Sequence, residues 1–161
     1  GLLMNEAQLY YKMGDTEGFK SRMNEAAAKD PNNPEIPFNL AIISYESEGA
    51  EAAIGHYMKA LEIDPKFEKA NRNLGYLYID QAERVVEEMN NLGTSAADNK
   101  RYDELQELQK QYYRDSAKYL EVANEVEESV DKLRALSSIY SFLGETDKYK
   151  AKKARLEELG G

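Results

Sequence analysis

Apolar residues recur along this chain at spacings of three and four, which is the period of an amphipathic α-helix rather than of a strand. Across residues 19–31, Phe19, Met23, Ala26 and Pro31 are four, three and five residues apart. The same spacings return across residues 53–65 and again end on a proline. The two prolines, Pro31 and Pro65, are 34 residues apart. The pattern therefore predicts an all-α chain built from repeated helical segments.

A second pattern precedes the first in each repeat and consists of a large residue, a leucine, a small residue and an aromatic residue. A small side chain facing a large one lets two helices approach closely, so the pattern is typical of helices that pack in pairs. Its copies, from the most complete to the least, lie at Asn71–Tyr78, Leu133–Tyr140, Pro37–Ser44 and Leu3–Tyr10.

Together these patterns resemble the tetratricopeptide repeat (TPR) family over essentially the whole chain, in particular bacterial members with one elongated repeat. The resemblance implies a single right-handed α-solenoid of antiparallel helix pairs over residues 1–161. It gives four repeats, at about 1–33, 34–67, 68–129 and 130–161. The last repeat is expected to be a terminal cap, because it ends in a helix rich in Lys and Glu.

The third repeat is longer than the others. Its small-residue positions, Gly75 and Ser116, are 41 residues apart, whereas Ala41 and Ala53 in the second repeat are 12 apart. The 29 additional residues, near 79–108, keep the helical period. They therefore predict a lengthened helical hairpin rather than a loop.

The turn of this hairpin is predicted at Asn91–Asp98, with Gly93 ending one helix and Ser95 or Asp98 capping the next. If the insertion is shared equally, each helix gains about 14 residues and the hairpin extends by roughly 20 Å. Two interpretations are open. The extension is either an insertion that packs only on itself or an arm that docks a partner.

Composition narrows the range of partners. The 161 residues carry a formal net charge of −9 at pH 7 without a dense Lys/Arg stripe, which argues against nucleic acid. No stretch approaches the roughly 18 apolar residues that cross a bilayer, so membrane insertion is not expected. The absence of cysteine excludes disulfides and thiolate metal sites.

The localisation is left open by the sequence. It is cytoplasmic by default and periplasmic if a signal sequence has been removed upstream. The apolar start at Leu2, which has no polar cap, indicates that sequence has been cut away before residue 1. The charged final helix suggests that the array ends with this chain.

In TPR proteins the first helix of each pair lines a concave surface, so the resemblance places a peptide-binding groove on that face. Aromatic and aliphatic residues would anchor the ligand, and amide and charged side chains would satisfy its polar groups. The alternative is that several of these tyrosines pack within or between repeats. The candidate groove residues are Tyr11, Phe38, Asn39, Ile42, Tyr45, Lys69, Arg72, Asn73, Tyr76, Asp80 and Arg134.

One TPR subclass grips a C-terminal carboxylate with Lys, Asn and Arg side chains on successive first helices. Asn39 and Lys69 match two of those positions. Met4 and Gln8 stand where Lys and Asn are needed, and Asn73 replaces the Arg. A carboxylate clamp is therefore not expected.

Catalytic chemistry is not predicted either. A Ser, Thr or Cys nucleophile needs a neighbouring base, and the only histidine is His56, which we expect on the outer surface of its helix. One histidine does not form a zinc site, and acidic pairs such as Glu87-Glu88 lack the loop of a calcium site. We therefore expect no enzyme activity, no cofactor and no metal.

The leading hypothesis for function is a protein-interaction scaffold that binds a peptide or a partner protein in the groove. Two alternatives are open. The first is an architectural segment of a longer solenoid or a self-associating homo-oligomer, which Leu2, Leu3 and Met4 at the uncapped end favour. The second is a non-catalytic accessory domain of a larger enzyme or transporter complex.

Overall fold

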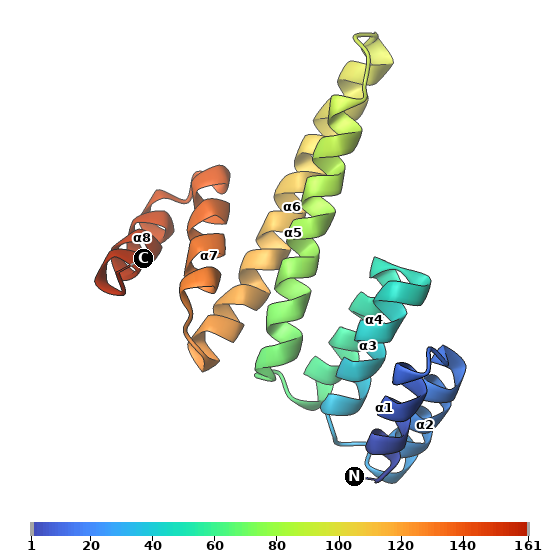
Figure 1. Ribbon diagram of the computed structural model, residues 1–161. Helices are drawn as coiled ribbons and strands as arrows, with labels where there is room; N and C mark the ends of the chain where they lie inside the picture. The colour runs from blue at the N-terminus through green and yellow to red at the C-terminus, as the bar shows by residue number, and fades with distance from the viewer. Residues whose placement is uncertain (1, 161) are drawn as a thin grey trace. The chain divides into compact units, whose positions relative to one another are not determined.

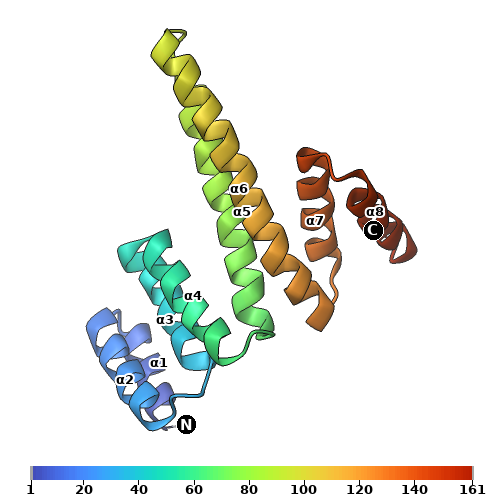
Figure 2. The same cartoon turned by 180° about the vertical axis from the view of Figure 1, so that it is seen from behind.

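The computed structural model describes residues 2–160, which form eight α-helices and no strand. Consecutive helices pair as hairpins (Figures 1 and 2), so the predicted all-α solenoid fold is confirmed. The chain divides into two compact units, residues 1–70 and 71–161. The helices are α1 (Leu2–Lys12), α2 (Thr16–Lys29), α3 (Glu35–Glu48), α4 (Ala50–Ile63), α5 (Glu68–Asn90), α6 (Ala96–Val126), α7 (Val130–Leu143) and α8 (Thr146–Glu158).

The first unit contains the hairpins α1–α2 and α3–α4, which share one core. Helix α2 packs on α1 at one side and on α3 at the other, so each of the three helices buries an apolar stripe. The frame predicted across residues 19–31 forms the α2 stripe, and its counterpart in α4 is buried as well. The core side chains are Ala7 of α1, Phe19, Met23 and Ala26 of α2, and Ile36, Leu40 and Ile43 of α3.

A single residue, Gly49, separates α3 from α4. Its φ of +96° lies in the region that side chains with a Cβ rarely adopt, and its N–H donates to the Ser44 carbonyl at 2.9 Å. At the start of α3, the Asn33 side chain accepts a hydrogen bond from the Glu35 N–H at 3.1 Å. The second hairpin thus has a glycine turn, and the Asn33 side chain satisfies one backbone N–H group at its start.

The second unit is held together at its base by a hydrogen-bonded carboxylate. The Tyr140 hydroxyl of α7 donates to Glu121 of α6 at 2.7 Å, and Lys152 of α8 pairs with the other Glu121 oxygen at 2.5 Å. Burial and the Glu121 contact raise the pKa of Tyr140 well above its ordinary value. Glu121 therefore joins three helices, next to a core of Ala117, Leu120, Leu136, Ile139 and Tyr140.

Helices α5 and α6 lie close together at Gly75. A Cβ at this position would lie 2.6 Å from Cγ of Leu120, so any larger residue requires that side chain to shift. Further along, the Tyr78 ring stacks on Tyr119 with centroids 5.9 Å apart, and it lies 6.1 Å from Tyr112. Burial and these neighbours raise the pKa of Tyr78 to about 12.

The elongated hairpin is confirmed, but the equal division of its extra residues is wrong. Helix α5 has 23 residues and α6 has 31, whereas α3 and α4 have 14 each. The turn lies closer along the chain to the start of α5 than to the end of α6. The start of α6 is fixed by a capping box, in which the Asp98 N–H donates to the Ser95 hydroxyl and the Ser95 N–H donates to the Asp98 carboxylate. Residues 79–108, called the arm below, run to the tip of this hairpin (Figure 1).

The arm has its own small core. Val85 and Met89 of α5 and Leu105 of α6 are buried together, with Tyr112 packed against them. An ion pair joins Arg101 to Glu88 at 2.7 Å. The outer part of the arm therefore packs on itself, whereas Ile79 at its start packs on the α6–α7 cluster.

Candidate protein-binding surfaces

The groove candidates of the first unit differ in accessibility. Tyr11 of α1 is 44% exposed and Tyr45 of α3 is 38% exposed, and the two stand at the same repeat position, 34 residues apart. Phe38 is only 8% exposed, because its ring lies against Tyr57 and Phe67 at centroid distances of 5.9 and 5.6 Å. Phe38 is thus a core residue, whereas the two tyrosines are accessible side chains.

The polar candidates of this unit have partners within it. The Lys69 ammonium pairs with Glu35 at 2.6 Å and lies about 6 Å from the ring centroids of Phe38 and Phe67. The Asn39 side-chain amide donates to the Glu35 carbonyl at 2.6 Å. Ile42 is half-buried. Lys69 and Asn39 therefore both contact Glu35, the first residue of α3.

In the second unit, four candidates follow one another along α5 at helical spacing. Tyr76 is 37% exposed, Arg72 and Asn73 are half-buried, and Asp80 accepts a hydrogen bond from Arg84 at 3.1 Å. Arg134, on α7, is exposed. The structure thus brings Arg72, Asn73, Tyr76 and Asp80 together on one helix.

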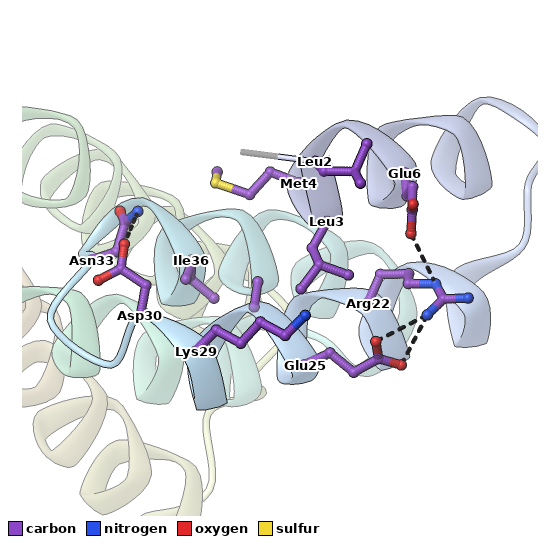
Figure 3. A pocket seen from close by; sticks show the side chains of 11 residues that line it. Leu2, Leu3, Met4, Glu6, Arg22, Glu25, Lys29, Asp30, Asn33 and Ile36 are labelled. Carbon is purple, nitrogen blue, oxygen red and sulfur yellow. Dashed lines mark hydrogen bonds and ion pairs between the residues drawn. The ribbon is translucent and has the colours of Figure 1, made fainter.

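A pocket of about 590 Å³ lies between α1, the end of α2 and the start of α3, and the groove prediction does not include it. Its apolar part includes Leu3, Met4 and Ile36. Figure 3 shows the charged part of its rim, where Arg22 forms ion pairs with Glu6 at 3.5 Å and Glu25 at 2.9 Å. A pocket with an apolar floor and a charged rim suits an apolar side chain of a partner that is surrounded by polar groups.

The sequence explains why this pocket of about 590 Å³, called the first pocket below, is present. Residues of the two repeats correspond at a shift of 34, so that Met4 matches Phe38 and Asn33 matches Phe67. In the second repeat the two phenylalanines pack edge to face. In the first repeat Met4 and Asn33 line the pocket instead. A repeat-by-repeat comparison of the linkers, where Asn33 and Phe67 stand, would have indicated it.

A second, smaller pocket of about 220 Å³ lies between α2, the start of α3 and α4. It includes His56, which is half-buried, so the expectation of an outward-facing histidine is wrong. The Nδ1 atom of this ring is buried and has no hydrogen-bond partner. Burial, helped by the charge of Lys59, lowers the pKa of His56, which keeps the ring neutral near pH 7.

Two kinds of site are not found in the part of the chain that the structure describes. Between residues 2 and 160, no three His, Cys, Asp or Glu side chains are arranged to hold a metal ion. In the same range, no helix has the length and apolar character needed to cross a membrane.

No family model matches the sequence, and no curated protein matches it. Solved structures do match. A putative protein-binding protein from Bacteroides ovatus has a TM-score of 0.72 at 21% identity, over 89% of this chain and 73% of that one. MamA has a TM-score of 0.59 at 15% identity, over 98% and 78% of the two chains.

The first TPR of Spaghetti (RPAP3), solved with an HSP90 peptide of sequence SRMEEVD, has a TM-score of 0.56 at 17% identity. The match covers 89% of this chain and 94% of that one. Identities at this level are informative about the fold. The chain has the tetratricopeptide-repeat fold, with one elongated repeat.

Proposed function

We propose that the chain is a protein-interaction scaffold that binds a peptide or a partner protein on the face formed by the first helices of its repeats. The observation that carries this proposal is the pair of accessible tyrosines, Tyr11 and Tyr45, at the same position on α1 and α3. A tyrosine ring offers a large apolar area and a hydroxyl, which makes it a frequent anchor at interfaces. Repetition of the ring on successive repeats suits an extended ligand.

Two further features support this proposal. Tyr76 of α5, 37% exposed, adds a third accessible ring on a first helix, in the second unit. The Spaghetti structure, which has the same fold, contains a bound peptide. Because the sequence does not predict a carboxylate clamp, we propose that this chain holds the middle of a peptide rather than its C-terminal carboxylate.

The proposal includes the absence of catalysis. The one histidine, His56, is half-buried, and its Nδ1 atom is buried away from the surface. A general base needs to reach the group whose proton it removes. We therefore propose that ligand binding alone is the biochemical activity of this chain.

A capture experiment with three baits tests the groove. The baits are the wild type, a Tyr11→Ala/Tyr45→Ala variant, and Tyr102→Ala as matched control, because Tyr102 is 45% exposed but lies on the arm. Loss of two anchor rings should weaken partner recovery at least about tenfold, whereas the control should recover as much as the wild type. Equal recovery by all three baits would refute the assignment of the groove.

A photo-crosslinking residue at position 45, compared with one at position 102, makes the result independent of affinity. The proposal expects partner adducts at position 45 only. Adducts at position 102 alone would move the binding surface from the groove to the arm.

A further inference from the structure

Helix α1 has an exposed apolar face whose counterpart in the next repeat is buried. At the shift of 34 residues, Leu2 matches Ile36 and Leu9 matches Ile43. Leu2 is 75% exposed and Leu9 is 60% exposed, whereas Ile36 and Ile43 are 1% and 4% exposed. The same two positions are therefore core in one repeat and surface in the other.

The isoleucines of α3 are buried because α2 lies against them. Ile36 and Ile43 belong to the core cluster that includes Phe19, Met23 and Ala26 of α2. The leucines of α1 lie one repeat earlier, and Leu3 and Met4 beside them pack on that same cluster. The exposed face thus continues an interface that the first unit already contains.

The linings of the two pockets show the same correspondence between repeats. Six positions of the first pocket match six of the second at the shift of 34, including Leu2 with Ile36 and Arg22 with His56. The second pocket has an additional wall, made by Asn24, Ala27 and Pro31 of the preceding repeat. The first pocket lacks this wall and is larger, at about 590 Å³ against 220 Å³.

From these correspondences we infer that the α1 face bearing Leu2 and Leu9, together with the first pocket, is a docking surface for an α-helix of the α2 type. Such a helix belongs to another TPR-type hairpin stacked in front of α1. It carries a large apolar residue, then apolar residues four and seven positions later, as α2 does with Phe19, Met23 and Ala26. This surface is distinct from the groove.

The chemistry of the face adds one requirement. Glu6 stands between Leu2 and Leu9, where the second repeat has the buried Leu40. Its carboxylate keeps an ion pair with Arg22 at 3.5 Å. A helix that covers Glu6 must leave this pair intact or offer a hydrogen-bond donor, since a buried carboxylate without a partner is strongly unfavourable. The occupant is thus amphipathic, with a polar side chain opposite Glu6.

The test supplies a helix of this type. In an extended chain, residues 1–34 are placed directly before residue 1, so that a second α2 precedes α1 through its own linker. If α1 is a stacking face, the added hairpin covers Leu2 and Leu9 of the original copy. Repeat arrays gain stability from each interface between neighbours, so the thermal midpoint should rise by about 4 °C or more.

The matched variant is Leu9→Glu in the original copy. In the 161-residue chain this residue is exposed, so the substitution should change the thermal midpoint by less than about 1 °C. In the extended chain it should abolish the gain. No gain with the wild-type face, or a gain that survives Leu9→Glu, would overturn the inference.

Light scattering on the 161-residue chain checks the competing occupant. A dimer that Leu9→Glu dissociates would mean that a second copy covers the face, which would also overturn the inference. A Tyr11→Ala/Tyr45→Ala variant should show the same stabilisation in the extended chain as the wild type. Failure of the groove proposal and failure of this one are therefore distinguishable.

Discussion

The hairpins α3–α4 and α5–α6 use the same contact pattern at different lengths. In the short hairpin, Ala41 and Ala53 occupy the small-residue positions and both are fully buried. In the long hairpin these positions hold Gly75 and Ser116, and Gly75 is the place where Leu120 meets the α5 backbone. In the long hairpin a glycine thus takes the place of alanine where a leucine of the partner helix packs on the backbone, and the additional residues lie beyond this contact.

The additional length brings its own contacts. Beyond Gly75 the tyrosine stack of Tyr78 and Tyr119 follows, and beyond that the separate cluster of Val85, Met89 and Leu105. The short hairpin has one continuous core with its neighbour, whereas the long one has contacts in series. The base and the arm should therefore respond differently to equivalent substitutions.

Truncation of two leucines in α6 is the most severe test. Leu120 at the base and Leu105 in the arm are both fully buried. Leu120→Ala should lower the free energy of unfolding by about 2–5 kcal/mol. Leu105→Ala should lower it clearly less in the global transition, because the arm can open locally, and it should speed hydrogen exchange across residues 85–105.

Denaturant unfolding and hydrogen exchange measure the two effects. Equal losses of global stability would contradict the separation of base and arm, because they would mean that the hairpin unfolds as one unit along its length.

A pair of glycine substitutions tests the close approach at Gly75. Gly75→Ala places a Cβ 2.6 Å from the Leu120 side chain and should destabilise the protein by about 1–3 kcal/mol, despite the better helix propensity of alanine. Gly55→Ala in α4 is the matched control, because no atom lies within 4 Å of its new Cβ. It should stabilise by about 0.5–1 kcal/mol. Shifts of the same sign in thermal melts would show that the contact at Gly75 is not tight.

The capping box at the tip is the next test in size. Ser95→Ala removes the acceptor of the Asp98 N–H and should destabilise the first turn of α6 by about 1 kcal/mol. Amide exchange at residues 98–101 should accelerate while the thermal midpoint stays almost constant. Exchange that is unaffected by Ser95→Ala would place the start of α6 elsewhere.

The smallest effect is expected in the short hairpin, at His56. Burial lowers its pKa in the folded state, so the unfolded state takes up a proton first as the pH falls. The contribution of the neutral His56 ring to the free energy of unfolding is fully present above the unfolded pKa of about 6.5. It decreases as the pH falls through that value. His56→Gln should therefore make the thermal midpoint depend less on pH between pH 7 and 5.5. Parallel profiles for the two proteins would exclude His56 as the cause.

Much of the fold could be predicted from spacing, because helix pairing depends on the size and period of side chains. The turn at Ser95 and the core of α2 follow from local chemistry. The unequal lengths of α5 and α6 do not follow from the number of additional residues, because that number does not tell how they are divided between the two helices.

The site was less predictable for a reason that Phe38 illustrates. Its cover, Phe67, stands in a linker outside either helix pattern, so the helix period alone makes Phe38 a groove residue. The first pocket has the same origin, in Asn33 at the equivalent linker position. Side chains from linkers decide which helical positions are open, and the period of the helices does not include them.

The turn at the end of the arm also makes the chain suitable for single-site labelling. The sequence has no cysteine, so Thr94→Cys would create the only thiol, at an exposed turn residue. Helix α6, with 31 residues, is roughly 46 Å long. A dye attached there would report by energy transfer whether a labelled ligand binds near the tip, and the chain would carry that reporter without a change to any of the three hydrophobic clusters.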